Sequence, residues 1–291
     1  MKTNFNEENL KYYNALKDDK AFQSVGEHNS VIKQVKNIIA NTKPNPEKLF
    51  IAEGIWAHQK IVETSTPIQS FIVCLDYIYT NEAIELIKKI RTITDNLFFV
   101  SSKTFDKISE RERPDGLLSI AYLPRYKIED FKVKEKSIIL VLDGIEIPGN
   151  IGTMLRVCDG AAVDAVFICN RKARLTHPKL IKGSMYSVLT VPILEFENVE
   201  DCYNWLNKNN FKIYLADTRA EKTYFSMHYK DRTAFVMGSE RYGISRDWYN
   251  YDCELLSIPM LGKCDSLNVG VAATVLIYDA TMKIKLGEKY D

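Results

Sequence analysis

The sequence predicts an α/β protein of two domains, residues 1–125 and residues 126–291. Three observations support this. The chain has 291 residues, enough for two hydrophobic cores. Short apolar runs alternate with helical patterns on both sides of a polar, charged segment at 123–136. The runs after this segment are apolar on both faces, as the strands of a covered parallel sheet are.

The first domain is predicted to be a small layered α/β unit. A helix is expected over 28–41, where apolar residues recur at the spacing of one helical face: Val31, Val35, Ile38 and Ile39. The segment 41–46, with its two prolines, ends this helix. The same reasoning predicts helices at 54–64 and 81–91 and strands at 49–52, 70–75, 97–100 and 117–121.

The second domain is predicted to alternate strands and helices. Strands are expected at 137–142, 165–169, 212–216 and 233–237, and helices near 150–160 and 199–209. A further strand is expected to end at Ile258, because Pro259 has no N–H for a sheet hydrogen bond. A last helix is expected from Asn268 to Leu286, with Ser266 as a candidate for its N-cap region.

Composition limits the classes of protein that fit. Hydrophobic residues make up 46% and charged residues 26%, as in soluble globular proteins. No apolar run approaches the roughly 18 residues of a membrane span, and the first residues lack the apolar core of a signal peptide. The six cysteines include no CxxC pair. We therefore expect reduced thiols in a cytoplasmic protein, without membrane contact, disulfide framework or metal site.

The formal net charge of +1 argues against indiscriminate binding of nucleic acid. Two local groups of basic residues remain. One comprises Arg171, Lys172, Arg174, His177, Lys179 and Lys182, and the other comprises Lys103, Lys107, Arg111, Arg113, Arg125 and Lys127. Both fit solvated surface and both fit phosphate contacts, and the sequence leaves these two interpretations open.

Three glycine-containing blocks follow predicted strands in the second half. The first, 142–156, places Gly144, Gly149 and Gly152 around Asn150. Glycines here permit a tight turn and the close approach of a ligand to the backbone, and a turn without a ligand is the alternative. The spacing is not GxGxxG and no Lys-Ser/Thr pair follows. Neither a dinucleotide loop nor a Walker loop is therefore indicated.

The second and third blocks also lie at expected strand ends. In the second, 237–243, Gly238 leaves room for a flat adenine or a carboxylate beside the backbone. Glu240, taken alone, would be an ordinary solvated acid. The third block, 257–272, leads into the last helix, where free amide groups suit a polar or anionic part of a ligand.

In this order, the three blocks resemble the motifs of the SpoU (TrmH-type) branch of the SPOUT RNA 2′-O-ribose methyltransferases. The resemblance covers residues 137–286 and implies methyl transfer from S-adenosylmethionine to a ribose 2′-hydroxyl of RNA. It also implies a deep trefoil knot, an exception among protein folds, and a homodimer in which the partner chain completes each site. Residues 1–125 resemble, less specifically, the ribosomal-protein-like RNA-binding domain that precedes the catalytic domain in several rRNA methyltransferases of this branch.

The same resemblance implies roles for individual residues. The catalytic centre it implies consists of Asn150, Arg156, Glu240, Ser266 and Asn268. Because arginine is normally protonated, we expect Arg156 to bind phosphate and stabilise the developing alkoxide, with a role as general base as the alternative. The implied S-adenosylmethionine site consists of Ala216, Asp217, Thr218, Met237, Gly238, Ile258, Met260 and Leu267. No metal is implied.

Three departures from the usual motifs are present. Ile147-Pro148-Gly149 stands where most relatives have Asp-Pro before the asparagine, Ser239-Glu240-Arg241 stands where they have Asn-Glu-Gly, and Gly270 replaces a serine. The first two resemble the thiostrepton- and nosiheptide-resistance methyltransferases, which modify an adenosine ribose in large-subunit rRNA. Large-subunit (23S) rRNA is therefore the favoured substrate, and whether the modification confers antibiotic resistance is left open.

Three alternatives remain. Transfer RNA is a competing substrate, although tRNA enzymes of this family generally lack so long an N-terminal domain. A catalytically inactive RNA-binding homologue is disfavoured, because all five residues of the implied catalytic centre are present. An α/β enzyme that uses NAD or ATP is disfavoured by the missing phosphate loop.

Overall fold

The computed structural model describes residues 5–287. Residues 1–4 and 288–291, the outermost residues of the two predicted domains, lie outside the described part. The contacts divide the chain into two compact units. Unit 1 comprises the chain up to Pro124 with Thr176–Pro178, and unit 2 comprises Arg125–Leu175 and the chain from Lys179 onward. Each unit has its own sheet and its own core.

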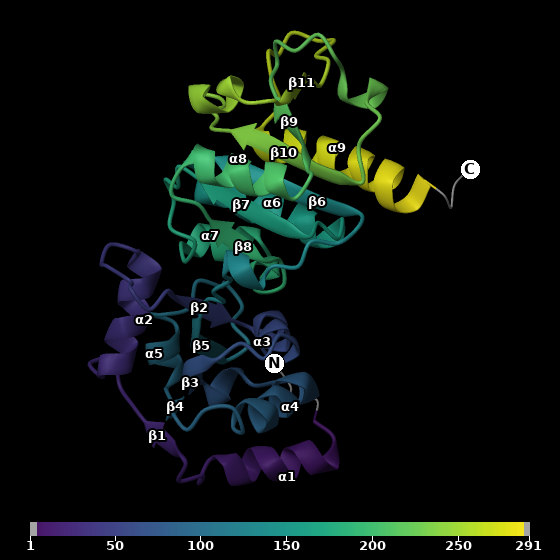
Figure 1. Ribbon diagram of the computed structural model, residues 1–291. Helices are drawn as coiled ribbons and strands as arrows, with labels where there is room; N and C mark the ends of the chain where they lie inside the picture. Colours follow the sequence, from purple (N-terminus) through teal and green to yellow (C-terminus); the bar gives the residue numbers. More distant parts are fainter. Residues whose placement is uncertain (1–4, 288–291) are drawn as a thin grey trace. The chain divides into compact units, whose positions relative to one another are not determined.

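Unit 1 is built on a mixed five-stranded sheet in the order β1-β4-β3-β5-β2 (Figure 1). The strands are β1 (Phe22–Ser24), β2 (Leu49–Glu53), β3 (Ile68–Val73), β4 (Leu97–Phe99) and β5 (Leu117–Tyr122). β1, β4 and β3 run parallel, and β5 pairs antiparallel with β3 and β2. The four strands predicted in this half are confirmed. β1 was not expected, because three residues are too few for a periodic pattern.

The α-helices described in unit 1 are α1 (Glu7–Leu16), α2 (Ser30–Ala40), α3 (Ile55–Glu63), α4 (Asn81–Ile90) and α5 (Ser102–Phe105). α2 begins after Asn29, whose side chain accepts a hydrogen bond from the Val31 N–H, and ends at Asn41 in the left-handed conformation. Its apolar face places Ile32 and Val35 in a core shared with β3 and β5. α1 was not expected, because only two of its ten residues are buried and it lacks an apolar stripe.

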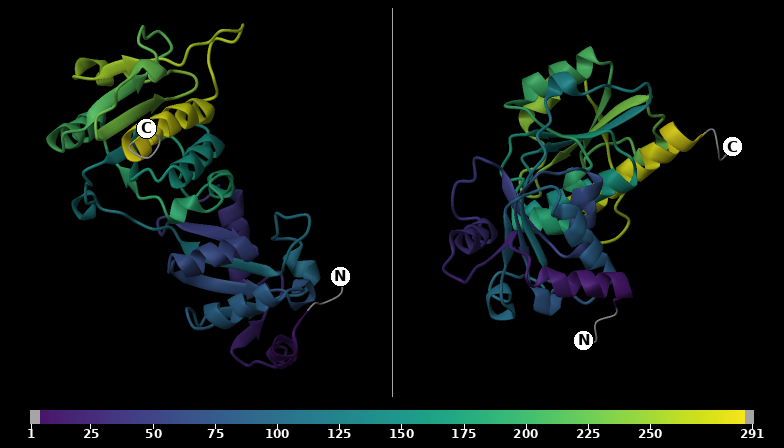
Figure 2. Two further views of the ribbon diagram at one scale, coloured as in Figure 1. Left: turned by 90° about the vertical axis from the view of Figure 1, so that its right-hand side faces the viewer. Right: turned by 90° about the horizontal axis from the view of Figure 1, so that it is seen from below.

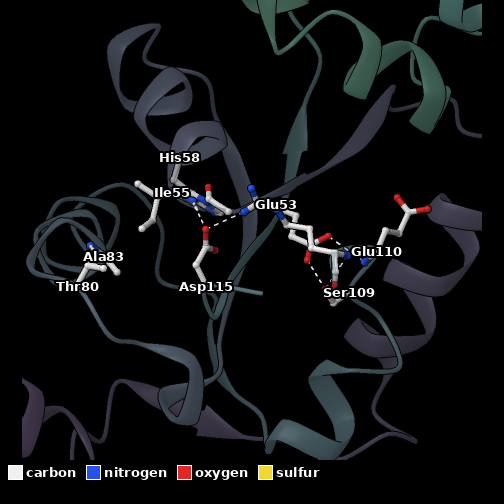
Figure 3. A network of polar contacts seen from close by, with 10 residues as sticks. Glu53, Ile55, His58, Thr80, Ala83, Ser109, Glu110 and Asp115 are labelled. Carbon is white, nitrogen blue, oxygen red and sulfur yellow. Dashed lines mark hydrogen bonds and ion pairs between the residues drawn. The ribbon is translucent and has the colours of Figure 1, made fainter. Parts of the chain in front are cut away.

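A polar network holds the loop between α5 and β5 (Figure 3). Asp115 Oδ2 accepts a hydrogen bond from the Ile55 N–H at 2.9 Å. Glu53 accepts hydrogen bonds from the Ser109 hydroxyl and from the Glu110 N–H. The loop is therefore fixed to the end of β2 and to the first turn of α3.

His58 of α3 is completely buried. Its Nδ1 lies 2.7 Å from the Gly54 carbonyl oxygen and its Nε2 lies 2.8 Å from the Ser119 hydroxyl. A carbonyl can only accept, so Nδ1 donates and Nε2 accepts from the hydroxyl. Burial lowers the pKa of His58 to about 4, because the charged ring would lose its hydration.

Unit 2 is built on a six-stranded sheet in the order β11-β9-β10-β6-β7-β8, with all neighbouring strands parallel (Figure 1). The strands are β6 (Ser137–Asp143), β7 (Ala165–Cys169), β8 (Ile193–Glu195), β9 (Lys212–Ala216), β10 (Arg232–Gly238) and β11 (Glu254–Leu256). Every residue of β6 and β7 is buried, which confirms the predicted covered parallel sheet.

Two details of unit 2 differ from the prediction. β8 was not expected, since it has only three residues. β11 ends at Leu256, two residues before the predicted end at Ile258, because Leu256 pairs with Ala216, the last residue of β9. Pro259 therefore lies in the loop beyond the strand and not at its last position.

Helices cover both faces of the unit 2 sheet. They are α6 (Pro148–Gly160), α7 (Pro178–Gly183), α8 (Val199–Lys208) and α9 (Val269–Thr281). Cys202 and Leu206 of α8 share a core with Ile139 and Val141 of β6. Side chains alternate along a strand, so the residues between these two face the opposite side. There α6 and α9 pack side by side (Figure 2).

The predicted last helix is shorter than expected as an α-helix. α9 ends at Thr281, and a π-helical turn, η6 (Met282–Leu286), continues it. The 3₁₀ turns are η1 (Leu75–Tyr77), η2 (Ile128–Asp130), η3 (Ser187–Leu189), η4 (Tyr224–Ser226) and η5 (Arg246–Asn250). Among residues 5–287, no helix has the length and apolar character needed to cross a membrane. The trefoil knot stays a prediction.

Candidate active site

Loops that follow the carboxyl ends of β6, β9, β10 and β11 surround a cavity of about 1150 Å³ in unit 2. β9 lies between β10 and β11, and β6 lies beside β10. In a parallel sheet these ends share one edge, where α/β proteins commonly bind ligands. The three sequence blocks therefore meet at one place.

The cavity gathers nearly all of the predicted site residues. All eight residues predicted for the cofactor line it: Ala216, Asp217, Thr218, Met237, Gly238, Ile258, Met260 and Leu267. Four of the five predicted catalytic residues line it as well: Asn150, Glu240, Ser266 and Asn268. Arg156 is exposed on α6 and is not among the described residues that line the cavity.

Asn150 joins the three blocks by hydrogen bonds. Its amide nitrogen donates to Glu240 Oε1, and its amide oxygen accepts from the Asn268 amide nitrogen at 3.3 Å. The Asn268 amide oxygen accepts the Gly270 N–H at 2.9 Å. A backbone N–H can only donate and a carboxylate can only accept, so both amides have one consistent orientation. We call these three side chains the Glu240–Asn150–Asn268 row.

The start of α9 positions one end of this row. Asn268 is the N-cap residue of α9, and its side chain accepts the hydrogen bond that a cap requires. Ser266 was the candidate for this region, and the assignment was wrong by two residues. Gly270 has no side chain that could crowd the cap, since a Cβ there would lie 3.2 Å from Asn268 Oδ1.

A tight turn positions Glu240 at the other end of the row. The Ser239 N–H donates to the Gly243 carbonyl oxygen at 3.0 Å, and the Gly243 N–H donates back to Ser239 at 2.9 Å. Gly243 has a φ of +71°, which favours glycine. A Cβ on Gly238 would lie 2.2 Å from the Gly243 carbonyl carbon and from the Ile244 nitrogen. Gly238 lines the cavity, but the chain's own backbone is what excludes a side chain there.

The glycines of the first block also serve the fold. Gly144 has a φ of +65°, so the turn after β6 requires it. A Cβ on Gly152 would lie 2.6 Å from the Leu180 carbonyl oxygen. The close approach at Gly152 is therefore between α6 and α7, and not to a ligand as the sequence had suggested.

Asp143 was not singled out in the sequence, although it ends β6. It is buried, and its carboxylate accepts hydrogen bonds from the Asn170 side chain and the Ser245 N–H, both at 2.7 Å. One carboxylate thus ties the loops after β6, β7 and β10 together. An acidic residue at the end of a predicted strand, directly before Gly144, was the signal in the sequence.

The wall after β9 carries a second polar cluster. The Asp217 carboxylate accepts hydrogen bonds from Arg219 Nη2 at 2.9 Å and from the Tyr249 hydroxyl at 2.6 Å. The Arg219 guanidinium, together with Tyr249, holds the pKa of Asp217 well below its usual range. Burial and the Asp217 charge raise the pKa of Tyr249 to about 12. Arg219 and Tyr249 lie outside the three blocks, so no motif pointed to them.

The cavity fits S-adenosylmethionine. Its volume is above the roughly 300–1,000 Å³ of common small-molecule sites, which leaves space for a reacting ribose. One group of lining residues is apolar and suits a flat adenine: Met237, Leu256, Ile258, Leu267 and Val269. Glu240 supplies a carboxylate that suits a sulfonium. The described residues contain no cluster of three or more metal-ligand side chains.

Comparison with known proteins identifies the chain. The model of the SpoU rRNA Methylase family matches residues 137–278. A putative TrmH family tRNA/rRNA methyltransferase of Staphylococcus saprophyticus is 31% identical over 172 residues, which is 56% of this chain and 69% of the relative. The chain belongs to the SpoU family. It is therefore an S-adenosylmethionine-dependent RNA methyltransferase.

Two further similarities support the SpoU assignment. The 23S rRNA (guanosine(2553)-2′-O)-methyltransferase RlmP of Bacillus subtilis is 25% identical over 181 residues, 62% of this chain and 71% of the relative. A crystal structure of an RNA 2′-O ribose methyltransferase is 25% identical, with a TM-score of 0.75 over 90% of this chain and 99% of that one. The structural match thus extends beyond the SpoU domain.

Proposed function

We propose that this SpoU protein methylates a ribose 2′-hydroxyl of ribosomal RNA, and of large-subunit (23S) rRNA in particular. The observation that carries this proposal is the Glu240–Asn150–Asn268 row inside the cavity. The Bacillus subtilis relative is named for the same reaction on 23S rRNA, which supports both the reaction and the substrate. We place the protein in the cytoplasm, because its six cysteines are free.

In this proposal the row orients the reactants. S-adenosylmethionine supplies a methyl group activated by a sulfonium. The ribose hydroxyl attacks the methyl carbon as it loses its proton, and it must approach in line. Glu240 fixes Asn150, and Asn150 fixes Asn268, so that Asn268 and Ser266 hold the ribose at a defined place. The start of α9 suits the polar end of the cofactor, because the first N–H groups of a helix have no carbonyl partner within it.

We assign Arg156 to the cavity of a second chain in a homodimer. Arg156 is exposed on α6, and α6 packs beside α9. Three large apolar side chains of α9 and η6 remain exposed, namely Val271, Tyr278 and Met282. Their spacing of seven and four residues places them on one helical face, which a second copy would cover. There the Arg156 guanidinium would bind phosphate and stabilise the alkoxide as it develops.

A heterodimer of two inactive variants tests this assignment. Arg156→Ala and Glu240→Ala chains with different tags are co-expressed, and the mixed dimer is purified. If each cavity uses Arg156 of the partner, one cavity of the mixed dimer has both residues, and about half of the wild-type activity returns. If Arg156 serves its own cavity, the mixed dimer stays inactive.

We propose that unit 1 binds RNA through a cavity of about 480 Å³, whose lining includes Tyr77, Tyr79, Arg111 and Arg113. The Arg111 guanidinium is held by Asp115 at 2.7 Å and packs against the bare Gly54 backbone, where a Cβ would lie 1.9 Å from Nη1. Arginine and tyrosine side chains bind phosphates and stack on bases. Asp106 and Glu112 also line this cavity, and their negative charges reduce the non-specific attraction of RNA.

Arg113→Ala tests this second cavity. We expect weaker RNA binding. The slope of log K against log[salt] should become smaller in magnitude by about one. Lys33→Ala is the matched control, since Lys33 is exposed on α2 and lies outside the cavity. Equal effects of the two variants would count against the cavity.

The first experiment on the whole proposal uses methyl-labelled S-adenosylmethionine with unmodified 23S rRNA and with bulk tRNA. Label at a ribose of rRNA alone is the expected result. Label in tRNA would keep the reaction and change the substrate. Cofactor binding with no label in either RNA would point to another RNA, and loss of cofactor binding would favour a catalytically inactive RNA-binding protein.

A further inference from the structure

Two exposed apolar side chains lie beside the polar row and have no part in the chemistry described so far. The Tyr242 side chain is 71% exposed and the Ile147 side chain is 49% exposed. Both line the same cavity as Asn150 and Glu240. Large apolar side chains left in water at the mouth of a ligand site commonly mark a contact surface.

Tyr242 is held rigidly next to Glu240. The Tyr242 N–H donates to Ser239 Oγ at 2.9 Å, within the turn that Gly243 closes. The Arg241 guanidinium lies 5.1 Å from the Tyr242 ring centroid, a cation–π distance. The turn therefore positions the backbone that carries the ring, while Tyr242 as a residue stays largely exposed.

Ile147 reaches the same place from the other block. It is the N-cap residue of α6, three positions before Asn150, and both residues line the cavity. The hydrogen bond between Asn150 and Glu240 joins α6 to the turn. Ile147 is thus three residues from Asn150, and Tyr242 is two residues from Glu240, the residue to which Asn150 is hydrogen-bonded.

We propose that Tyr242 and Ile147 form a slot for the unstacked nucleobase of the nucleotide that is methylated, with Tyr242 as its stacking platform. This inference rests on the proposed function, since a ribose beside Asn268 and Ser266 brings its own base to the same cavity. Single-stranded RNA is recognised mainly by stacking of splayed bases on aromatic side chains. Ile147 supplies an apolar wall and no hydrogen bond, so the slot selects a flat base without reading its edge.

Tyr242→Ala, Tyr242→Phe and Ile147→Ala test the slot. Stacking on a side chain contributes about 1–3 kcal/mol per base, so Tyr242→Ala should lower kcat/KM for RNA by about 5- to 150-fold. Tyr242→Phe keeps the ring and should stay near wild type. Ile147→Ala should show a smaller loss. The Kd of S-adenosylmethionine and the mass of the assembly should be unchanged in all three.

An RNA that lacks the base at the methylated nucleotide provides the decisive comparison. With wild-type protein this abasic RNA should lose about as much kcat/KM as Tyr242→Ala loses on normal RNA. Tyr242→Ala should lose little further kcat/KM on the abasic RNA, because the missing base and the substitution remove the same contact. Additive losses would overturn the slot.

Other outcomes also overturn the slot. A weaker Kd for S-adenosylmethionine in Tyr242→Ala would make Tyr242 a cofactor contact, and a change in mass would make it an interface residue. Phe225→Ala is the control, because Phe225 is 60% exposed and lies outside the cavity; an equal loss there would also contradict the slot. Failure of the proposed function is distinguishable, since wild-type protein would then methylate no RNA.

Discussion

Asn150 is the residue on which the site depends most, because its side chain both donates and accepts. It donates to Glu240 and accepts from Asn268. Among side chains of this size and shape, only an amide does both in fixed directions, since a carboxylate only accepts. Glu240 and Asn268 are exposed and Asn150 is half-buried, so the main effect of the row is to fix the direction of each of the three side chains.

Asn150→Asp should therefore abolish most of the activity. The substitution removes the donor and sets two carboxylates against each other, which raises the pKa of one of them. We expect kcat to fall by about 100-fold or more, with S-adenosylmethionine affinity little changed. Single-turnover methylation and isothermal titration measure the two effects.

Asn150→Asp combined with Glu240→Gln is the matched control. The second change supplies an amide donor opposite the new carboxylate, so the contact re-forms in the reverse direction. Thermal stability should recover while methylation should not, because the carboxylate then lies on α6. Wild-type activity in the single variant would show that the direction of the row is unimportant.

His58 makes the stability of unit 1 depend on pH. Its pKa is about 4 in the folded state and about 6.5 when unfolded. The folded pKa is lower, so this stabilisation is complete above about pH 6.5 and is lost as the pH falls towards 4. The loss approaches about 3 kcal/mol. Hydrogen exchange of β5 at pH 7.5 and pH 5 should show faster opening at the lower pH, after correction for intrinsic exchange rates.

His58→Gln provides the comparison for this prediction. Its β5 should show the same free energy of opening at both pH values, although a lower one than wild type at pH 7.5. A pH dependence that persists in the variant would assign the effect to another group.

At the scale of elements, the contact between α6 and α7 positions the first block. Gly152 allows the two backbones to touch, and α6 then presents Asn150 to the cavity. Gly149 lies in the same helix and faces open space, because a Cβ there would meet nothing within 4 Å. The two glycines thus differ in packing while sharing one helix.

Gly152→Ala and Gly149→Ala should consequently have opposite effects. The first forces α6 away from α7 and should cost about 1–3 kcal/mol of unfolding free energy. The second should be neutral or stabilising by up to about 1 kcal/mol, since alanine favours a helix more than glycine does. Urea unfolding followed by circular dichroism compares them. Equal destabilisation by both would argue against the contact as the cause.

At the scale of the whole molecule, the exposed face of α9 predicts the assembly state. Val271→Glu places a charge on that face and should convert the proposed dimer into a monomer. If Arg156 serves the partner's cavity as proposed above, methylation should fall with it, because each cavity would lose that arginine. Light scattering measures the mass. Ile93→Glu is the control, since Ile93 is an exposed apolar residue of unit 1.

Much of this molecule could be predicted from its sequence, and the reasons for the gaps are physical. The buried strands β6, β7, β9 and β10 could be predicted from the sequence because both of their faces are apolar. Short elements such as β1 and β8 are decided by pairing with distant strands, which local patterns do not contain. Arg219 and Tyr249 reach the cavity from loops without a motif. Arg156 could be selected only by the family resemblance, because within one chain its side chain is exposed on the surface of α6.

The row centred on Asn150 also determines when the active site can form during synthesis of the chain. Its two hydrogen bonds join residues 90 and 118 positions apart in the chain. Contacts of such sequence separation form late in folding, because long loops must close first. A nascent chain that has not yet released α9 from the ribosome lacks Asn268 and the helix that it caps. The active site can therefore form only after α9 has left the ribosome, and a chain terminated before α9 cannot methylate RNA.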